Sequence, residues 1–176
     1  QPTKLQTLQK ENYYVIYRGK RTFSACVFKP TAENYIIDSS LSYINCNKEG
    51  KNKAHFYAAA LNYLAYKAIK SNRGFIRDQY GKPLQALTIA KLTWDQFKEK
   101  YGESKLSEVI KLSELIHQKV PKKEYDVERS AFQELENIDE FKKLIKIFDN
   151  YVKENNINLN SALSLVTTIQ QENQKI

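Results

Sequence analysis

The sequence predicts an α+β fold, in which a small antiparallel β-meander packs on a buried helix and a helical C-terminal half follows. Three observations lead to this prediction. Short segments rich in β-branched and aromatic residues fill residues 13–47, and an apolar segment of helical composition spans residues 52–70. Beyond residue 104, apolar residues recur at three- and four-residue steps. With 176 residues, of which 41% are hydrophobic, the chain can bury a substantial core.

Four strands are expected in the first quarter of the chain, at residues 13–18, 22–28, 34–38 and 41–47. Turn-forming residues separate these segments, at Gly19-Lys20, Lys29-Pro30-Thr31 and Ser39-Ser40. The residues before position 13 have the composition of a polar lead. Because short turns join consecutive strands, we expect the strands to pair in sequence order.

The helix expected at residues 52–70 is apolar on nearly every side, which is typical of a buried helix. Gly74 is expected to stop it in a left-handed conformation. Further helices are expected at residues 84–92, 93–102, 104–119, 138–153 and 159–169. Thr93 is the predicted N-cap of the second of these, and Asn137 and Glu140 form a predicted capping box. We expect residues 1–92 to be a basic β/α part and residues 93–176 a helical part packed on it.

Positive charge is concentrated in the first half of the chain. The net charge is +8, and residues 1–90 hold 14 Lys and Arg against 5 Asp and Glu. The same residues hold 13 of the 21 aromatic side chains, so charge and stacking surface coincide, as nucleic-acid binding requires. Arg18, Lys20 and Arg21, at the first turn, are candidate DNA-binding residues. The alternative is a basic surface that binds nothing.

The segment "GFIRDQYGKP", residues 74–83, is a second candidate DNA contact. Arg73, Arg77 and Lys82 can neutralise phosphates, and Tyr80 adds an aromatic ring. Arg77 and Gln79 carry the forked donors and acceptors that recognise guanine and adenine edges in a major groove. Alternatively, Arg77 and Asp78 pair with the sheet or the helices and fix the loop in place.

Other kinds of chemistry find little support in the sequence. No glycine-rich phosphate loop is present, and His55 and His117 lack a neighbouring catalytic group. Cys26 and Cys46 have no metal-site spacing and are expected to be buried free thiols, so no metal is predicted. No run approaches the ~18 apolar residues of a membrane span, and we expect a cytoplasmic protein.

One acidic pattern allows an alternative enzyme function. Asp38, Glu49 and Lys51 have the order of a PD-(D/E)xK nuclease, in which two carboxylates hold Mg²⁺ and the lysine steadies the attacking water. Glu49 and Lys51 flank a glycine in a segment typical of a turn, whereas such a metal site requires a rigid strand. A third possible function is a protein-interaction module that uses the amphipathic helices.

Residues 35–62 resemble the C-terminal specificity region of TaqI-like adenine-specific DNA methyltransferases and fused restriction-modification enzymes. Their A-x-Y-Y-x-x-x-L-N helix is matched by Ala54, Phe56, Tyr57, Leu61 and Asn62. The segments "RGFIRDQYGKPL" and "EFKKLIKIFDNYV" are similar to the basic loop and closing helices of these proteins. The helix departs from the pattern after Asn62, because it continues as Tyr63-Leu64-Ala65-Tyr66.

The resemblance implies recognition of double-stranded DNA without catalysis by this chain. The Asn-Pro-Pro-Tyr loop of these enzymes and their glycine-rich turn for S-adenosylmethionine are absent from the sequence. S-adenosylmethionine would therefore bind a catalytic methyltransferase domain or subunit that acts as the partner. Because the sequence has no methionine, even at position 1, we expect the chain to be a segment of a larger protein.

Overall fold

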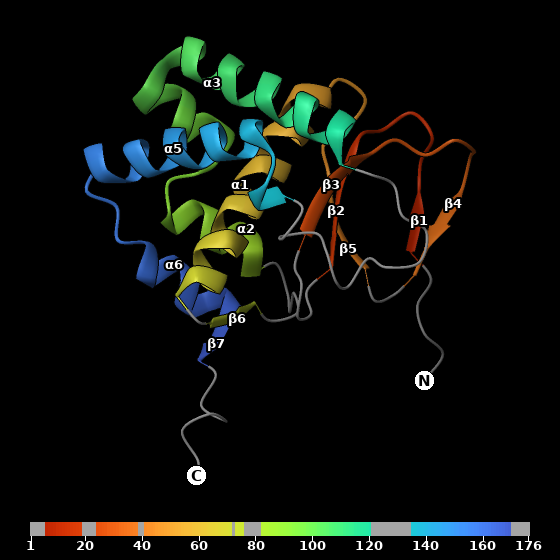
Figure 1. Ribbon diagram of the computed structural model, residues 1–176. Helices are drawn as coiled ribbons and strands as arrows, with labels where there is room; N and C mark the ends of the chain where they lie inside the picture. Colours follow the sequence, from red (N-terminus) through yellow and green to blue (C-terminus); the bar gives the residue numbers. More distant parts are fainter. Residues whose placement is uncertain are drawn as a thin grey trace.

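The computed structural model describes residues 6–18, 24–38, 41–71, 73–75, 82–120 and 135–169, with the backbone alone for Arg18, Ser24, Arg73–Phe75 and Thr167–Ile169 (Figure 1). Helix α1 (Lys51–Lys70) lies between a small antiparallel sheet and the other helices. The predicted α+β class is confirmed, with the strands mainly in the first half and the helices mainly in the second. Within the described residues, no helix is long and apolar enough to cross a membrane.

The strands do not pair in sequence order. The main sheet has the order β3-β2-β5, in which β2 (Tyr14–Arg18) lies between β3 (Ser24–Phe28) and β5 (Leu41–Asn45). Strand β4 (Tyr35–Ile37) pairs instead with β1 (Gln6–Leu8), which forms in the segment expected to be a polar lead. The predicted pairing in sequence order is therefore wrong, because local composition identifies strands but not their partners.

The main sheet buries both of its faces. Val15 and Tyr17 of β2, together with Ala25 of β3, face α1 and belong to the main core. Tyr14 and Ile16 point to the opposite face, where Leu8 and Ile37 of the β1–β4 pair cover them as part of a second apolar cluster. This alternation explains why β2 has buried residues at successive positions.

Helix α1 has nearly the bounds that the sequence predicts. It starts after Gly50, where a Cβ atom would lie 1.7 Å from the carbonyl oxygen of Cys46, so only glycine fits there. The predicted left-handed stop at Gly74 is wrong, because Ser71 is the C-cap and Gly74 lies within strand β6 (Arg73–Phe75). Strand β6 pairs with β7 (Thr167–Ile169), three residues expected to be helical.

The helical half packs on α1 through aromatic side chains. Helices α2 (Lys82–Ile89), α3 (Trp94–Lys119), α5 (Asp139–Glu154) and α6 (Leu159–Val166) are present. The rings of Phe56 in α1, Phe97 in α3 and Phe148 in α5 contact one another, with centroids 5.3 to 6.2 Å apart. The two halves of the chain thus share one apolar core.

Two helix-start predictions have different outcomes. Thr93 is the N-cap of α3, and its hydroxyl oxygen accepts a hydrogen bond from the backbone N–H of Gln96 at 3.3 Å. Helix α3 joins the two helices expected at residues 93–119, with Gly102 at φ 88° between them. The predicted capping box at Asn137 is wrong, because Ile138 is the N-cap of α5 and makes no side-chain cap.

Side chains from two helices close the outer edge of β3. The amide of Asn62 in α1 accepts from the N–H of Ala25 at 2.8 Å and donates to the carbonyl oxygen of Ala25 at 3.0 Å. His117 in α3 accepts from the N–H of Val27 through Nε2 at 3.0 Å. These contacts satisfy backbone groups that an edge strand otherwise leaves exposed, and they fix α1 and α3 against the sheet.

Replacing Asn62 tests this closure. We predict that Asn62→Ala lowers the free energy of unfolding by about 2 to 4 kcal/mol, because it leaves a buried N–H and a buried carbonyl group of Ala25 unpaired. The exposed Ser104→Ala in α3 serves as the control and should change stability little. Chemical denaturation measures both variants, and equal stability of Asn62→Ala and the wild type would contradict the role of the amide.

Candidate nucleic-acid interface

The structure places three of the predicted DNA-binding residues. Arg18 is the last residue of β2, Arg73 is the first residue of β6, and Lys82 is the half-buried first residue of α2. The remaining predicted residues lie outside the described residues; they are Lys20, Arg21, Arg77, Gln79 and Tyr80. The interface is therefore built from the elements on either side of these segments.

The register of the main sheet brings three strand ends together. Arg18 is opposite both Ser24 of β3 and Leu41 of β5, so these residues mark one end of the sheet. Helix α1 starts beyond the other end of the sheet, where the N–H of Cys46 donates to the carbonyl oxygen of Tyr13 at 2.8 Å. Helix α1 thus runs alongside the sheet toward the Arg18 end (Figure 1).

Strand β6 follows α1 directly, so Arg73 also lies at the end of the molecule where α1 finishes. We define the basic end as the region marked by Arg18, Ser24, Leu41, Lys70 and Arg73. The chain enters and leaves segment 19–23 here, between Arg18 and Ser24. It also enters segment 76–81 here, after Phe75. The fold therefore directs both flanks of segment 19–23 and the start of segment 76–81 to one end of the molecule.

Regular structure holds the chain on both sides of residues 76–81. On one side, β6 pairs along its whole length with β7, from Arg73 opposite Ile169 to Phe75 opposite Thr167. On the other side, α2 buries Pro83, Ala86 and Leu87 and packs against α6. A binding segment that is fixed at both ends loses less conformational entropy when it contacts a ligand.

The lysines at the end of α1 already have acidic partners. Lys67 lies 3.1 Å from an oxygen of Asp149, which also accepts a hydrogen bond from Tyr63 at 2.6 Å. Burial and Asp149 together raise the pKa of Tyr63. Lys70 lies 3.0 Å from an oxygen of Glu136. Since both lysines are already paired with carboxylates, phosphate contacts at the basic end are assigned to the predicted residues and not to these lysines.

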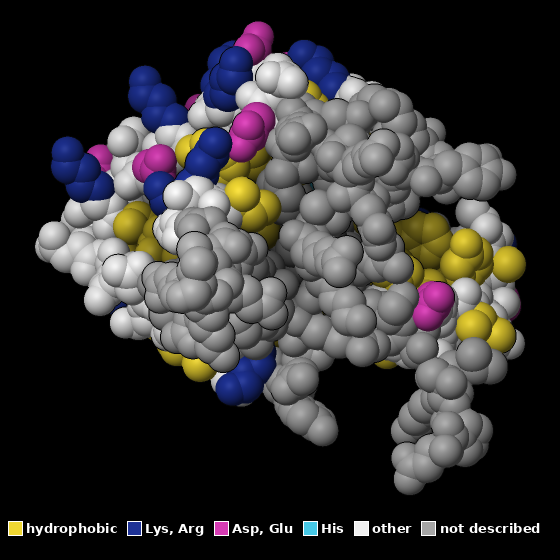
Figure 2. Space-filling model, turned by 60° about the horizontal axis from the view of Figure 1, so that its bottom comes forward, with side chains coloured by type: hydrophobic (Ala, Val, Ile, Leu, Met, Phe, Trp, Pro, Cys, Tyr) yellow, Lys and Arg dark blue, Asp and Glu magenta, His cyan; other side chains and the backbone are white. Residues whose placement is uncertain are grey.

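Figure 2 turns this end of the molecule toward the reader. The described Lys and Arg side chains stand mainly over the helices on one side of the view, with Asp and Glu side chains among them. Hydrophobic side chains show on both sides of the view, including the side of β1 and β4. Ile36 of β4 is 55% exposed. The described helical surface is thus mixed in charge, as expected for solvated helices.

The structure does not bring together the three residues of the alternative nuclease site. Asp38 follows β4, and its carbonyl oxygen accepts from the N–H of Leu41 at the start of β5. Glu49 lies in the turn after β5, and Lys51 is the first residue of α1. Asp38 and Glu49 thus lie beyond opposite ends of β5, a strand roughly 14 Å long, whereas two carboxylates that share one Mg²⁺ ion must lie side by side.

Metal ligands are not clustered in the parts of the chain that the structure describes, where no group of three or more His, Cys, Asp or Glu side chains could hold an ion. Cys46 is buried as predicted, and burial raises its pKa to about 11. The residue Cys26 is exposed, contrary to the prediction, although atoms packed around its thiol raise the pKa of that thiol. Neither thiol has the environment of a reactive thiolate, because the pKa of both is raised.

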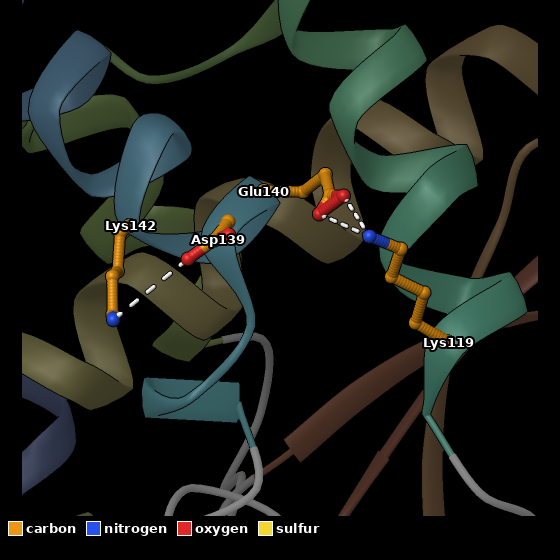
Figure 3. Close-up of polar contacts among 4 residues, drawn as sticks. All are labelled: Lys119, Asp139, Glu140 and Lys142. Atoms are coloured by element: carbon orange, nitrogen blue, oxygen red, sulfur yellow. Dashed lines mark hydrogen bonds and ion pairs between the residues drawn. The ribbon is translucent and has the colours of Figure 1, made fainter.

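The outer surfaces of α3 and α5 bear on the third predicted function, a helical interaction module. Figure 3 shows the polar contact between these helices, in which Lys119 of α3 reaches both carboxylate oxygens of Glu140 in α5. Asp139 and Lys142 lie 3.9 Å apart on the exposed side of α5. The Lys119 pair lowers the pKa of Glu140. These contacts join the two helices or lie on the solvated surface of α5, and the interaction module stays a prediction.

The buried His55 of α1 and the half-buried His117 of α3 form a polar cluster next to the sheet. Nδ1 of His55 lies 3.3 Å from the hydroxyl oxygen of Ser113, and the ring of His117 lies 4.9 Å from that of His55. Nδ1 of His117 donates to the carbonyl oxygen of Ser113 at 2.7 Å, while its Nε2 accepts from Val27. Because both nitrogens of His117 contact the backbone, the ring is neutral and structural.

Burial disfavours charge on this cluster. Burial, followed by the nearby His117 and Lys51, lowers the pKa of His55 to about 4. Burial also lowers the pKa of His117, although its hydrogen bond to Ser113 acts in the opposite direction. Protonation of His117 would place a second N–H donor against the N–H of Val27. The cluster therefore supports the fold only in its neutral form.

Comparisons with protein-family models, curated protein sequences and solved structures found no match for this chain. The resemblance to the methyltransferase specificity region therefore stays a prediction. Its motif residues all have folding roles here. Ala54, Phe56 and Leu61 are fully buried, the hydroxyl oxygen of Tyr57 accepts from the N–H of Trp94 at 3.1 Å, and Asn62 holds β3.

Sequence reasoning missed the contribution of Asn62 and His117 to the sheet. Their backbone partners lie 37 and 90 residues away in the chain. The available signal was a polar side chain inside an otherwise apolar helix, because a buried amide requires partners.

The histidine cluster predicts a loss of stability in mild acid. In the unfolded chain these groups titrate near 6.5, whereas folding holds the pKa of His55 at about 4. The unfolded state thus binds more protons between these values, so stability falls as the pH drops from 6.5 toward 4. The pKa of the Glu140 carboxylate is lowered from its ordinary value of 4.5, so its contribution to stability is lost as the pH falls below that value, outside most of this window.

Thermal melting across this pH range measures the effect. We expect a double variant, His55→Asn with His117→Gln, to show a flatter profile, since each amide can keep one ring-nitrogen contact without titrating. A wild-type melting temperature that stays constant from pH 7 to about pH 5 would contradict the neutral-cluster account.

Proposed function

We propose that this chain is a duplex-DNA recognition domain that contributes target binding to a DNA methyltransferase or restriction-modification enzyme. The supporting observation is that the strand ends on both sides of segment 19–23 and the strand that leads into segment 76–81 all lie toward the basic end of the molecule. These two segments and their flanks carry Arg18, Lys20, Arg21, Arg73, Arg77 and Lys82. Two cationic segments at one end can follow the phosphates of a duplex, whereas segments at opposite ends could not.

The division of labour within this interface follows from side-chain chemistry. Arg18, Lys20, Arg21 and Lys82 supply positive charge for phosphate oxygens, which gives affinity without sequence preference. Arg77 and Gln79 supply the paired donors and acceptors that distinguish bases, and Tyr80 supplies a ring for stacking. The helical half acts as the scaffold, since α2, α6 and β7 hold the chain around residues 76–81.

Catalysis is assigned to a partner. Without an Asn-Pro-Pro-Tyr loop and a glycine-rich turn, this chain has no means of holding a flipped adenine or S-adenosylmethionine in the way of the family that it resembles. The proposal is accordingly a domain that binds double-stranded DNA and presents it to a catalytic methyltransferase domain or subunit.

Fluorescence anisotropy with a labelled duplex at several salt concentrations tests the proposal. Affinity should fall steeply with salt, with ~0.9 added to the log–log slope for each neutralised phosphate. Lys82→Ala should weaken binding to all sequences and reduce the slope by about 1. Arg77→Ala or Gln79→Ala should cost about 1 to 3 kcal/mol on a duplex selected from a random library, and little on random duplexes.

Lys48→Ala provides the matched control, because Lys48 is exposed in the turn at the opposite end of the sheet. It should leave both the affinity and the slope unchanged. The proposal fails if the slope is near zero, or if Lys48→Ala weakens binding as much as Lys82→Ala does. Equal melting temperatures of the variants must accompany these measurements, so that a loss of binding is not a loss of folding.

A further inference from the structure

The two edge strands of the main sheet are treated differently. On β3, side chains of Asn62 and His117 satisfy the outward backbone groups of Ala25 and Val27. On β5, no side chain of the described residues covers the corresponding groups of two residues. This difference matters because an unpaired strand edge is a ready template for another strand.

The pairing pattern identifies the outward groups of β5. The backbone groups of Ala25 and Val27 point away from β2, so the residues of β3 that alternate with them form the hydrogen bonds to β2. Strand β2 therefore bonds to β5 through the backbone groups of Val15 and Tyr17. Their opposite residues, Ile44 and Ser42, therefore face β2. The outward backbone groups of β5 belong to the alternate residues, which are Leu41, Tyr43 and Asn45.

Leu41 already has partners for both of its outward groups. Its N–H donates to the carbonyl oxygen of Asp38 at 3.0 Å, and its carbonyl oxygen accepts from the side chain of Gln6 at 2.7 Å. The outward N–H and carbonyl groups of Tyr43 and Asn45 have no hydrogen-bond partner within the described parts of the chain. Two donors and two acceptors are thus open, at alternate positions of one strand.

We propose that β5 pairs antiparallel with β5 of a second copy of this chain, about a twofold axis at Ile44. In this register, Tyr43 of one copy lies opposite Asn45 of the other, and the two residues exchange both backbone hydrogen bonds. Asn45 of the first copy and Tyr43 of the second exchange two further backbone hydrogen bonds in the same way. All four open donors and all four open acceptors of the two copies are then satisfied. The result is one continuous sheet with the strand order β3-β2-β5-β5-β2-β3.

A second copy suits this edge because the edge is complementary to itself. The strand "LSYIN" has neither charge nor proline, so no like charges meet at the axis and no donor is missing. Pairing also covers apolar surface on both sides of the sheet. On one face of the sheet, Tyr43, a residue that is 38% exposed, lies next to the other copy. On the opposite face, the half-buried Ile44 side chains of the two copies lie against each other at the axis.

Sedimentation velocity of the full chain without DNA tests the proposal over a range of protein concentrations. The wild type should form a reversible dimer as its concentration rises. Tyr43→Lys places two positive charges near the axis and should raise the dissociation constant by roughly tenfold. Adding Asn45→Asp in the same chain brings a carboxylate opposite each lysine in the proposed register, and the dissociation constant should return toward that of the wild type.

Ile36→Lys is the matched control, since it removes an exposed apolar side chain from β4 and leaves the β5 edge unchanged. It should not alter the dissociation constant. A wild type that is monomeric at every concentration overturns the proposal, as does equal weakening by Ile36→Lys and Tyr43→Lys. Failure of the double variant to recover also overturns it, because the recovery depends on this register.

If Tyr43→Lys does not fold, the dimer is still tested by two measurements: the mass of the wild type, and the dissociation constant of the single variant Asn45→Asp, which places two like charges near the axis. Because these experiments contain no DNA, the dimer and the DNA-binding function can fail independently of each other.

Discussion

The arrangement of this molecule depends on how α1 is held against the outer edge of β3. The side-chain amide of Asn62 bonds both backbone groups of Ala25, which fixes the height of the helix along the strand. His117 adds a bond from α3 to Val27, two residues further along. An apolar helix on an apolar sheet can slide at little cost, whereas buried hydrogen bonds specify one position. The aromatic core between α1, α3 and α5 then fills the space that this position leaves.

The position of α1 determines what meets at the basic end. Because the helix runs toward the Arg18 end of the sheet, strand β6 and Arg73, which follow the helix, lie toward that end of the molecule. In the proposed dimer the paired β5 strands are antiparallel, so the two basic ends point in opposite directions and neither covers the other. A dimer would therefore present two sites for duplex DNA that face apart.

Local features of the fold could be predicted, and long-range ones could not. The bounds of α1 and the cap at Thr93 follow from residues adjacent in the chain, so the sequence identified them closely. Strand β1 was missed because its three residues have little apolar pattern, and it forms only because β4 pairs with it. Gly74 looked like a helix stop, but pairing with Thr168 places it in a strand. Such partners lie far apart in the chain, where composition carries no information about pairing.

The candidate site was predictable to a similar extent. Sequence chemistry indicated cationic segments around Arg18 and Arg77, and also an acidic trio that the fold then separates along β5. Which segments converge is decided by strand register and helix direction, and these are tertiary properties.

Amide chemical-shift mapping during titration with a short duplex tests most directly whether the basic end is the DNA-binding surface. The account predicts the largest changes at Arg18, Ser24, Leu41, Arg73 and Lys82, and small changes at the opposite end, from Asn47 to Lys53. Changes centred on Asn47 to Lys53, or no changes at all, would contradict it.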